Sequence, residues 1–134
     1  MIITFKEDRL MPNYSKQREA ILNELKSRYD HPTAKQVYEG VRNVMPNISL
    51  GTVYRNLSAL VESGEIISVS VGDGFEHFDG NRSFHLHQHC KLCGAITDVE
   101  VKAGNFESLS CSGGFLPEQS VCVVFGICKN CNKQ

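Results

Sequence analysis

Apolar side chains recur with the spacing of a helix in three consecutive segments of the first half of the chain. The first segment covers residues 16–29, and the Asp-His-Pro break at 30–32 ends it. Thr33 then begins a second helix, with a glutamine three positions on as in a capping box. Ser49 is a suitable N-cap for a third helix, which Gly64 ends. The expected inward-facing residues are Ala20, Ile21, Leu22, Leu25 and Tyr29 in the first helix, Val37, Tyr38, Val41 and Val44 in the second, and Val53, Leu57, Leu60 and Val61 in the third.

The pattern changes to strands after the third helix. Residues 65–71 are rich in β-branched side chains, 72–74 is a Gly-Asp-Gly turn, and 75–79 can return as a second strand. Three helices followed by a hairpin is the order of elements in a winged helix. The second half offers a strand near 96–101, a short helix around 105–109 and an apolar strand at 121–127.

These elements predict an α+β chain of two small parts. We expect an N-terminal winged helix-turn-helix domain at residues 1–80, a polar hinge at 81–84 and a small α/β C-terminal domain at 85–134. A domain of roughly 50 residues buries too little apolar surface to be stable without a metal or a partner. The second domain therefore needs an additional source of stability.

Composition narrows the class of protein without deciding it. The chain is 41% hydrophobic and 22% charged, which is typical of a globular protein. No apolar run approaches the roughly 18 residues of a membrane span, and the first ten residues carry charge too early for a secretory signal. A cytoplasmic location is the expectation. The net charge of -1 means that any DNA-binding surface must be a local patch.

Two Cys-x-x-Cys pairs are the strongest chemical signal in the sequence. They are Cys90 with Cys93 and Cys128 with Cys131. Two such knuckles supply the four thiolates of a closed, structural Zn²⁺ site, which leaves no open position for catalysis. A redox dithiol pair and unrelated buried thiols remain the alternatives. Cys111 and Cys122 lie outside the pairs and are expected to be a loop thiol and a core residue.

Histidine is scarce, and four of the five histidines lie between positions 77 and 89. His85 and His87 alternate on extended backbone, so their imidazoles point to the same side. With His31, Asp79 and Asp98 they would make a set of nitrogen and oxygen ligands that suits Fe²⁺, Mn²⁺ or Zn²⁺. The alternative is that these histidines are solvated surface residues. His77 and His89 are not assigned a role.

A polar face on the third helix makes it a candidate DNA-reading helix. Arginine and asparagine can recognise guanine and adenine edges, and a tyrosine ring can pack on a thymine methyl group. A solvated helix has the same kind of face, so both interpretations stay open. Lys16 and Arg18, at the start of the first helix, suit phosphate contacts. The candidate DNA contacts are Lys16, Arg18, Thr52, Tyr54, Arg55 and Asn56.

Several stretches, in this order, resemble the ferric uptake regulator family over nearly the whole chain. They are SKQREAIL, HPTAKQVYEGV, SLGTVYRNLSALVESG, HFD at 77–79, HLHQHCKLCGAITDVE and FGICKNC. The resemblance implies a homodimer that binds double-stranded operator DNA, with a C-terminal dimerisation domain, structural zinc and a regulatory metal at the domain junction. It places Tyr54 in the recognition helix. The ligands that it implies for the regulatory Fe²⁺ or Mn²⁺, with Zn²⁺ as an alternative, are His31, Asp79, His85, His87 and Asp98.

An aspartate at position 98 is similar to the peroxide-sensing PerR branch of that family, since iron-uptake members more often carry glutamate. This resemblance implies a repressor in which Fe²⁺ and peroxide oxidise His31 or His85 and DNA is released. The resemblance does not extend to a second exchangeable site, because Gln119, Ser120 and Val123 stand where many members carry metal ligands.

Other functions remain open from the sequence. A sensor of iron or zinc sufficiency would use the same ligands without histidine oxidation. A metal hydrolase is disfavoured because the chain has no His-Glu-x-x-His motif, so we expect no enzyme activity. A zinc-stabilised protein-interaction module would be indifferent to duplex DNA. We expect the operator to be an A/T-rich palindrome.

Overall fold

The computed structural model describes residues 12–83, 85–99, 112–116 and 121–133. The chain divides into two compact units, which we call unit 1 (residues 1–82) and unit 2 (residues 83–134). Within the described residues, no helix has the length and apolar character that a membrane span requires.

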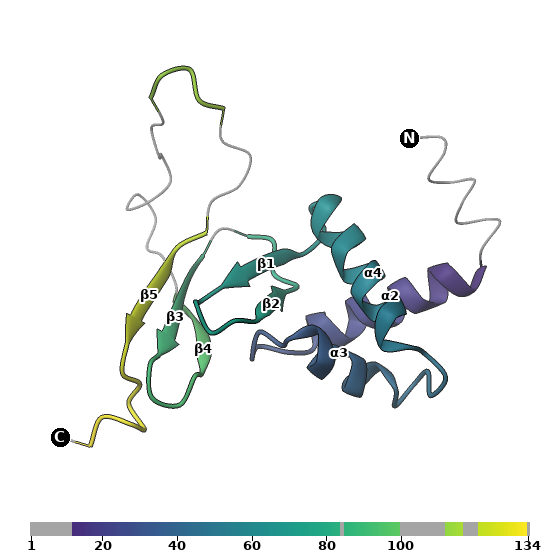
Figure 1. The fold of residues 1–134 in the computed structure, drawn as a ribbon, viewed down its shortest axis with the longest axis horizontal. Coiled ribbons are helices and arrows are strands. Elements are labelled where there is room, and N and C mark those ends of the chain that lie inside the picture. Colours follow the sequence, from purple (N-terminus) through teal and green to yellow (C-terminus); the bar gives the residue numbers. More distant parts are fainter. Residues whose placement is uncertain (1–11, 84, 100–111, 117–120, 134) are drawn as a thin grey trace. The chain divides into compact units, whose positions relative to one another are not determined.

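Unit 1 consists of helices followed by a β-hairpin (Figure 1). The hairpin is antiparallel, with Ile67 opposite Asp79 and Ser70 opposite Glu76. Its elements in chain order are α2 (Pro12–Lys26), α3 (Ala34–Val41), α4 (Leu50–Glu62), β1 (Ile67–Ser70) and β2 (Glu76–Asp79).

Local side-chain chemistry fixes where two of these helices begin. The Thr33 side chain accepts a hydrogen bond from the Gln36 backbone N–H while the Gln36 side chain accepts from the Thr33 N–H, so the predicted capping box is confirmed. Ser49 caps α4 by accepting from the Thr52 N–H at 3.1 Å, as predicted. Gly64 follows α4 with φ of 76°, a left-handed conformation that glycine adopts without strain.

Two predicted apolar positions are wrong because their helices end earlier than expected. Helix α2 ends at Lys26, so Tyr29 lies beyond it and is 80% exposed. Helix α3 ends at Val41, and Val44 is 72% exposed. The other apolar stripes pack into one core beneath the hairpin residue Phe78. Its buried residues include Ile21, Leu25, Val37, Val41, Val53, Leu57 and Leu60.

Unit 2 contains a three-stranded sheet with β3 in the middle (Figure 1). Its strands are β3 (Leu86–Cys90), β4 (Ile96–Val99) and β5 (Val123–Gly126). Strand β3 pairs antiparallel with β4 and parallel with β5. The strand expected at 121–127 therefore forms over 123–126, and the strand expected near 96–101 is present over 96–99, its last two positions lying outside the described residues. The expected helix at 105–109 lies outside the described residues.

Candidate functional site

The four paired cysteines gather in unit 2. One sulfur atom from each of Cys90, Cys93, Cys128 and Cys131 lies within 4.8 Å of the others. Cys93 Sγ and Cys128 Sγ are 3.8 Å apart. Bonds of about 2.3 Å from four sulfurs to one tetrahedral zinc ion require sulfur–sulfur separations of ~3.8 Å. The cluster therefore has the dimensions of a four-thiolate metal site.

The protonation behaviour of these thiols also suits a cation. Backbone N–H groups of Cys93 and Cys128 donate to the Cys90 sulfur and lower its pKa to about 5. The hydrogen bond with Cys128, together with burial, raises the pKa of Cys131 to about 12. One thiolate is thus stabilised by the backbone while another resists ionisation beside its neighbours. A divalent ion among the four sulfurs would stabilise all of them as thiolates.

Unit 1 brings together two of the predicted N/O ligands. His31 Nε2 lies 3.2 Å from Asp79 Oδ2, and both side chains are buried. Ligand atoms bound at roughly 2.0–2.2 Å to one ion lie about 3.0–3.4 Å apart, which matches this separation. His31 follows α2 in the connection to α3, and Asp79 ends β2.

Unit 2 brings together the other three predicted N/O ligands: His85 directly precedes β3, His87 lies on β3 and Asp98 lies on β4. His85 Nε2 lies 3.2 Å from Asp98 Oδ1, and His87 Nε2 lies 3.9 Å from the same oxygen. Because His87 pairs with Asp98 in the β3–β4 register, the backbone itself brings these side chains together. His85 Nδ1 donates to the Ser83 carbonyl at 2.7 Å, so in the neutral ring Nε2 carries the lone pair that a metal ligand needs.

The exposed face of α4 contains only part of the predicted DNA-contacting set. Tyr54 is 50% exposed, Arg55 is also exposed, and the Arg55 guanidinium donates to Thr52 Oγ1 at 3.1 Å. Asn56 is only 2% exposed, and its amide donates to the Thr52 carbonyl at 2.9 Å. In this conformation Asn56 cannot reach a base, because its position falls on the inner side of the helix.

The two predicted phosphate contacts on α2 differ in their surroundings. Lys16 is exposed. Arg18 forms an ion pair with Glu65, and Ser63 Oγ donates to the same Glu65 carboxylate at 2.8 Å. The Arg18 guanidinium is therefore held within unit 1 by a carboxylate.

The sequence left His77 without a role, and the structure gives it two contacts. Its ring lies on β2, with Nδ1 2.9 Å from the His31 carbonyl and Nε2 2.6 Å from Asp73 Oδ2. Partial loss of water around the exposed Asp73 opposes ionisation, but hydrogen bonds from His77 and the Phe75 N–H outweigh it and hold the pKa of Asp73 below its usual value. Only the four-residue spacing of Asp73 and His77 signalled this pair in the sequence.

The helices and hairpin of unit 1, the four-cysteine group and the histidine–aspartate group together are typical of metal-dependent transcription regulators. The family model described as "Ferric uptake regulator family" matches residues 12–109, and the chain belongs to this family. It is similar to the "Peroxide operon regulator" of Bacillus subtilis (strain 168), with 35% identity over 120 residues that cover 88% of this chain and 83% of that protein. It is also similar to the "Peroxide-responsive repressor PerR" of Staphylococcus aureus, with 35% identity over 117 residues, or 86% of this chain and 79% of that one.

Two solved structures of bacterial regulators resemble this fold. The Campylobacter jejuni peroxide stress regulator aligns with a TM-score of 0.74 at 25% identity, covering 98% of this chain and 100% of that one. The Helicobacter pylori ferric uptake regulator aligns with a TM-score of 0.71 at 18% identity, covering 98% and 93% of the two chains. The second likeness concerns the fold alone.

Proposed function

We propose that this protein is a metal-dependent, DNA-binding transcriptional repressor that senses peroxide. The observation that carries the proposal is the group of His85, His87 and Asp98 at the β3–β4 pair, with the His85 ring hydrogen-bonded to the Ser83 carbonyl. Two histidine nitrogens and a carboxylate suit Fe²⁺ or Mn²⁺ and do not suit Cu⁺. The curated relatives named above as peroxide regulators support peroxide as the signal.

The proposal assigns two metals. Zn²⁺ held by the four cysteines stabilises unit 2, and the sulfur spacing supports that assignment. A regulatory Fe²⁺ or Mn²⁺ is shared by five ligands, two from unit 1 and three from unit 2. The two carboxylate–imidazole distances of 3.2 Å, one in each unit, support their use as ligands. The five are His31, Asp79, His85, His87 and Asp98.

In the DNA complex, we propose that unit 1 is a winged helix-turn-helix domain with α4 as its recognition helix and β1–β2 as its wing. The exposed Tyr54 and Arg55 and the half-buried Thr52 would face the bases, and Lys16 a phosphate. Asn56 is not included because it is buried, nor is Arg18 because it is paired with Glu65.

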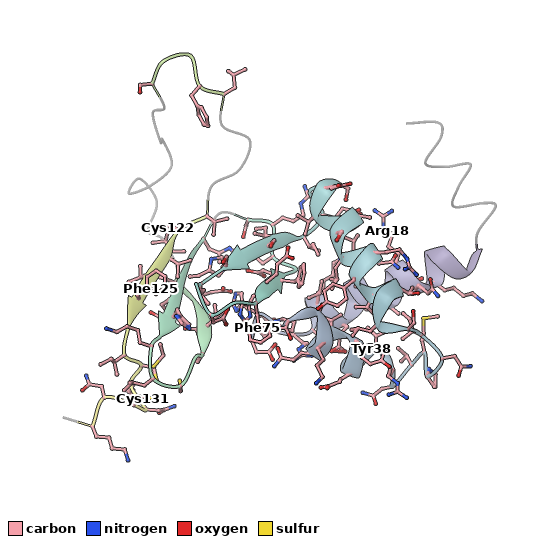
Figure 2. All side chains as sticks on the ribbon, in the orientation of Figure 1. Arg18, Tyr38, Phe75, Cys122, Phe125 and Cys131 are labelled. Carbon is pink, nitrogen blue, oxygen red and sulfur yellow. The ribbon has the colours of Figure 1, made fainter. Side chains whose placement is uncertain are left out.

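The proposed assembly is a homodimer on an A/T-rich palindrome, acting in the cytoplasm. Four large apolar side chains in or beside β5 are exposed, a surface that a second copy would bury. They are Val121, Val124, Phe125 and Ile127; Figure 2 shows Phe125 on the strand. A dimer presents two recognition helices, which must meet successive major grooves about 34 Å apart.

The regulatory ligands couple metal binding to DNA binding because they come from both units. An ion that binds the DNA-competent arrangement ~100-fold more tightly than the other supplies about 2.7 kcal/mol of coupling. By reciprocity, operator DNA tightens metal binding by the same factor. Fe²⁺ held by these five residues would supply the electron that reduces peroxide, and His31 and His85 are the ligand side chains that we expect to be oxidised. An oxidised His31 or His85 no longer offers the same nitrogen ligand, so the coupling is lost.

Peroxide should release DNA from the iron form only. The experiment loads the full chain anaerobically with Fe²⁺ or Mn²⁺ and measures binding to an A/T-rich palindromic duplex before and after dilute peroxide. Mass spectrometry of the peptides with His31 and His85 then detects added oxygen. Binding that requires metal but survives peroxide, with both histidines unmodified, would identify a sensor of metal sufficiency instead.

Replacing Arg55 with alanine should weaken specific DNA binding by about 1–3 kcal/mol, the usual value of a bidentate base contact. The loss should be concentrated at guanines in the operator, measured by fluorescence anisotropy with a set of single-base variants. Lys26→Ala is the matched control, since Lys26 is an exposed cation in the last turn of α2. Equal effects of the two substitutions would contradict base reading by Arg55.

A further inference from the structure

The buried His77 ring links two segments of unit 1 that are distant in sequence. Its Nδ1 lies 2.9 Å from the carbonyl oxygen of His31. A carbonyl oxygen only accepts, so Nδ1 is the donor. On the other side of the ring, Nε2 lies 2.6 Å from Asp73 Oδ2, in the turn of the β1–β2 hairpin. Asp73 is itself fixed, because its Oδ1 accepts from the Phe75 N–H at 3.0 Å.

His31 occupies a backbone conformation that needs such support. Its φ of 53° is positive, which is uncommon for a side chain with a Cβ, and it precedes Pro32, which restricts its conformation further. Strained residues of this kind persist where surrounding contacts hold them.

Strand β2 provides those contacts along its length. The Phe78 N–H donates to the Pro32 carbonyl at 2.9 Å, and Thr33 forms an isolated antiparallel bridge with His77. The His77 ring adds a side-chain hydrogen bond to the carbonyl of His31 itself. From this backbone the His31 imidazole reaches Asp79 at 3.2 Å.

We infer that His77, held by Asp73, is a positioning residue for the metal ligand His31. The pair fixes the backbone from which His31 presents its imidazole beside Asp79. Because Asp73 lies in the hairpin turn, the conformation of that turn and the position of a metal ligand are linked within unit 1. This inference rests on the proposed function, in which His31 binds the regulatory ion and the hairpin is the wing.

A second hydrogen bond in the same hairpin provides a control, because its loss destabilises the hairpin without affecting His31. Ser68 Oγ lies 2.6 Å from Glu76 Oε1, across the β1–β2 ladder. Ser68→Ala therefore removes one hairpin hydrogen bond without touching the His31 carbonyl. Asp73→Asn keeps an oxygen for the Phe75 N–H and an amide that can donate to His77 Nε2, so it should restore what Asp73→Ala loses.

The test uses the zinc-loaded full chain and measures Mn²⁺ affinity by electron paramagnetic resonance. His77→Phe, which keeps a ring but removes both hydrogen bonds, and Asp73→Ala should each weaken Mn²⁺ binding about tenfold, as loss of supporting contacts to metal ligands does. Asp73→Asn and Ser68→Ala should bind Mn²⁺ like the unmodified chain, although Ser68→Ala lowers the melting temperature. Equal Mn²⁺ affinity in all five proteins would overturn the inference.

A measurement without the regulatory metal tests the positioning role of His77 independently of the proposed function. The backbone amide signal of His31 in nuclear magnetic resonance spectra should move in His77→Phe and Asp73→Ala, but not in Ser68→Ala. If the unmodified chain binds no Mn²⁺, the proposed regulatory site is wrong. The positioning role is then judged by the His31 signal, and an unchanged signal in both variants overturns it. If the His77→Phe protein does not fold, the two Asp73 variants test whether the pair positions His31, because Asp73 lies in an exposed turn.

Discussion

Replacing Cys93 with serine is expected to unfold unit 2 while the helices and hairpin of unit 1 stay folded. Structural zinc contributes roughly 10–16 kcal/mol in small domains, and much of that depends on a complete set of thiolates. In the described part of unit 2 only three buried apolar residues are found, Leu86, Cys90 and Ile96, so little core remains to replace the metal. Zinc content, far-ultraviolet circular dichroism and proteolysis would report the loss.

The matched control for this prediction is Cys122→Ser. Cys122 is half-buried and lies at the opposite end of β5 from Cys131 (Figure 2), outside the four-sulfur cluster. Its replacement should leave the zinc content and the circular dichroism spectrum unchanged. A Cys93→Ser protein with normal zinc content and a normal spectrum would refute the zinc assignment.

Replacing His85 with alanine is expected to abolish metal-dependent DNA binding without disturbing zinc or the dimer. The substitution removes the imidazole 3.2 Å from Asp98, so the regulatory ion loses a ligand from unit 2. Operator affinity in the presence of Mn²⁺ should fall ~100-fold, or about 2.7 kcal/mol, to that of the metal-free protein. Anisotropy titrations with and without Mn²⁺ measure this change.

His89→Ala provides the comparison, four residues further along the same extended segment. His89 follows His87 on the same face of β3, but its ring packs edge-on against Phe125, with centroids 5.8 Å apart, and it is not in the ligand group. Its replacement should preserve the response to Mn²⁺. If the His85→Ala protein no longer folds or dimerises, His85 has a structural role and the regulatory assignment fails.

Features governed by neighbours in the sequence could be predicted well. The capping box at Thr33, the cap at Ser49 and the left-handed Gly64 depend on residues within a few positions, and the sequence displays them directly. The thiol cluster could also be predicted, since two knuckles have few alternative uses. The inward-facing stripes followed from helical periodicity.

Features that depend on tertiary contacts could not be predicted. The ends of α2 and α3 were misplaced by a few residues because Tyr29 and Val44 continue an apolar pattern that the helices do not follow. Polar character alone could not place Asn56, whose amide bonds to its own helix. The partner of Arg18 is a glutamate far along the chain, beyond any local signal.

Strand β3 was the least visible element. Its sequence, LHQHC, lacks the β-branched residues that usually mark a strand, yet it is the central strand of its sheet. The alternation of His85 and His87 was the only local indication of extended backbone. The role of His77 was equally hidden, because a hydrogen bond to the carbonyl of His31 leaves no pattern in the sequence.

The parallel pairing of β3 with β5 has a consequence for synthesis on the ribosome. The contacts of unit 1 lie within the first 82 residues, so it can fold while translation continues. Unit 2 must wait for β5, since β3 has its parallel neighbour and its second pair of sulfurs only when residues 123–131 have emerged. Each new chain therefore passes through a period with a folded unit 1 and an unfinished unit 2. With zinc as the proposed ion of the four sulfurs, we expect the yield of complete protein to depend on zinc supply at the moment of synthesis, before any peroxide is encountered.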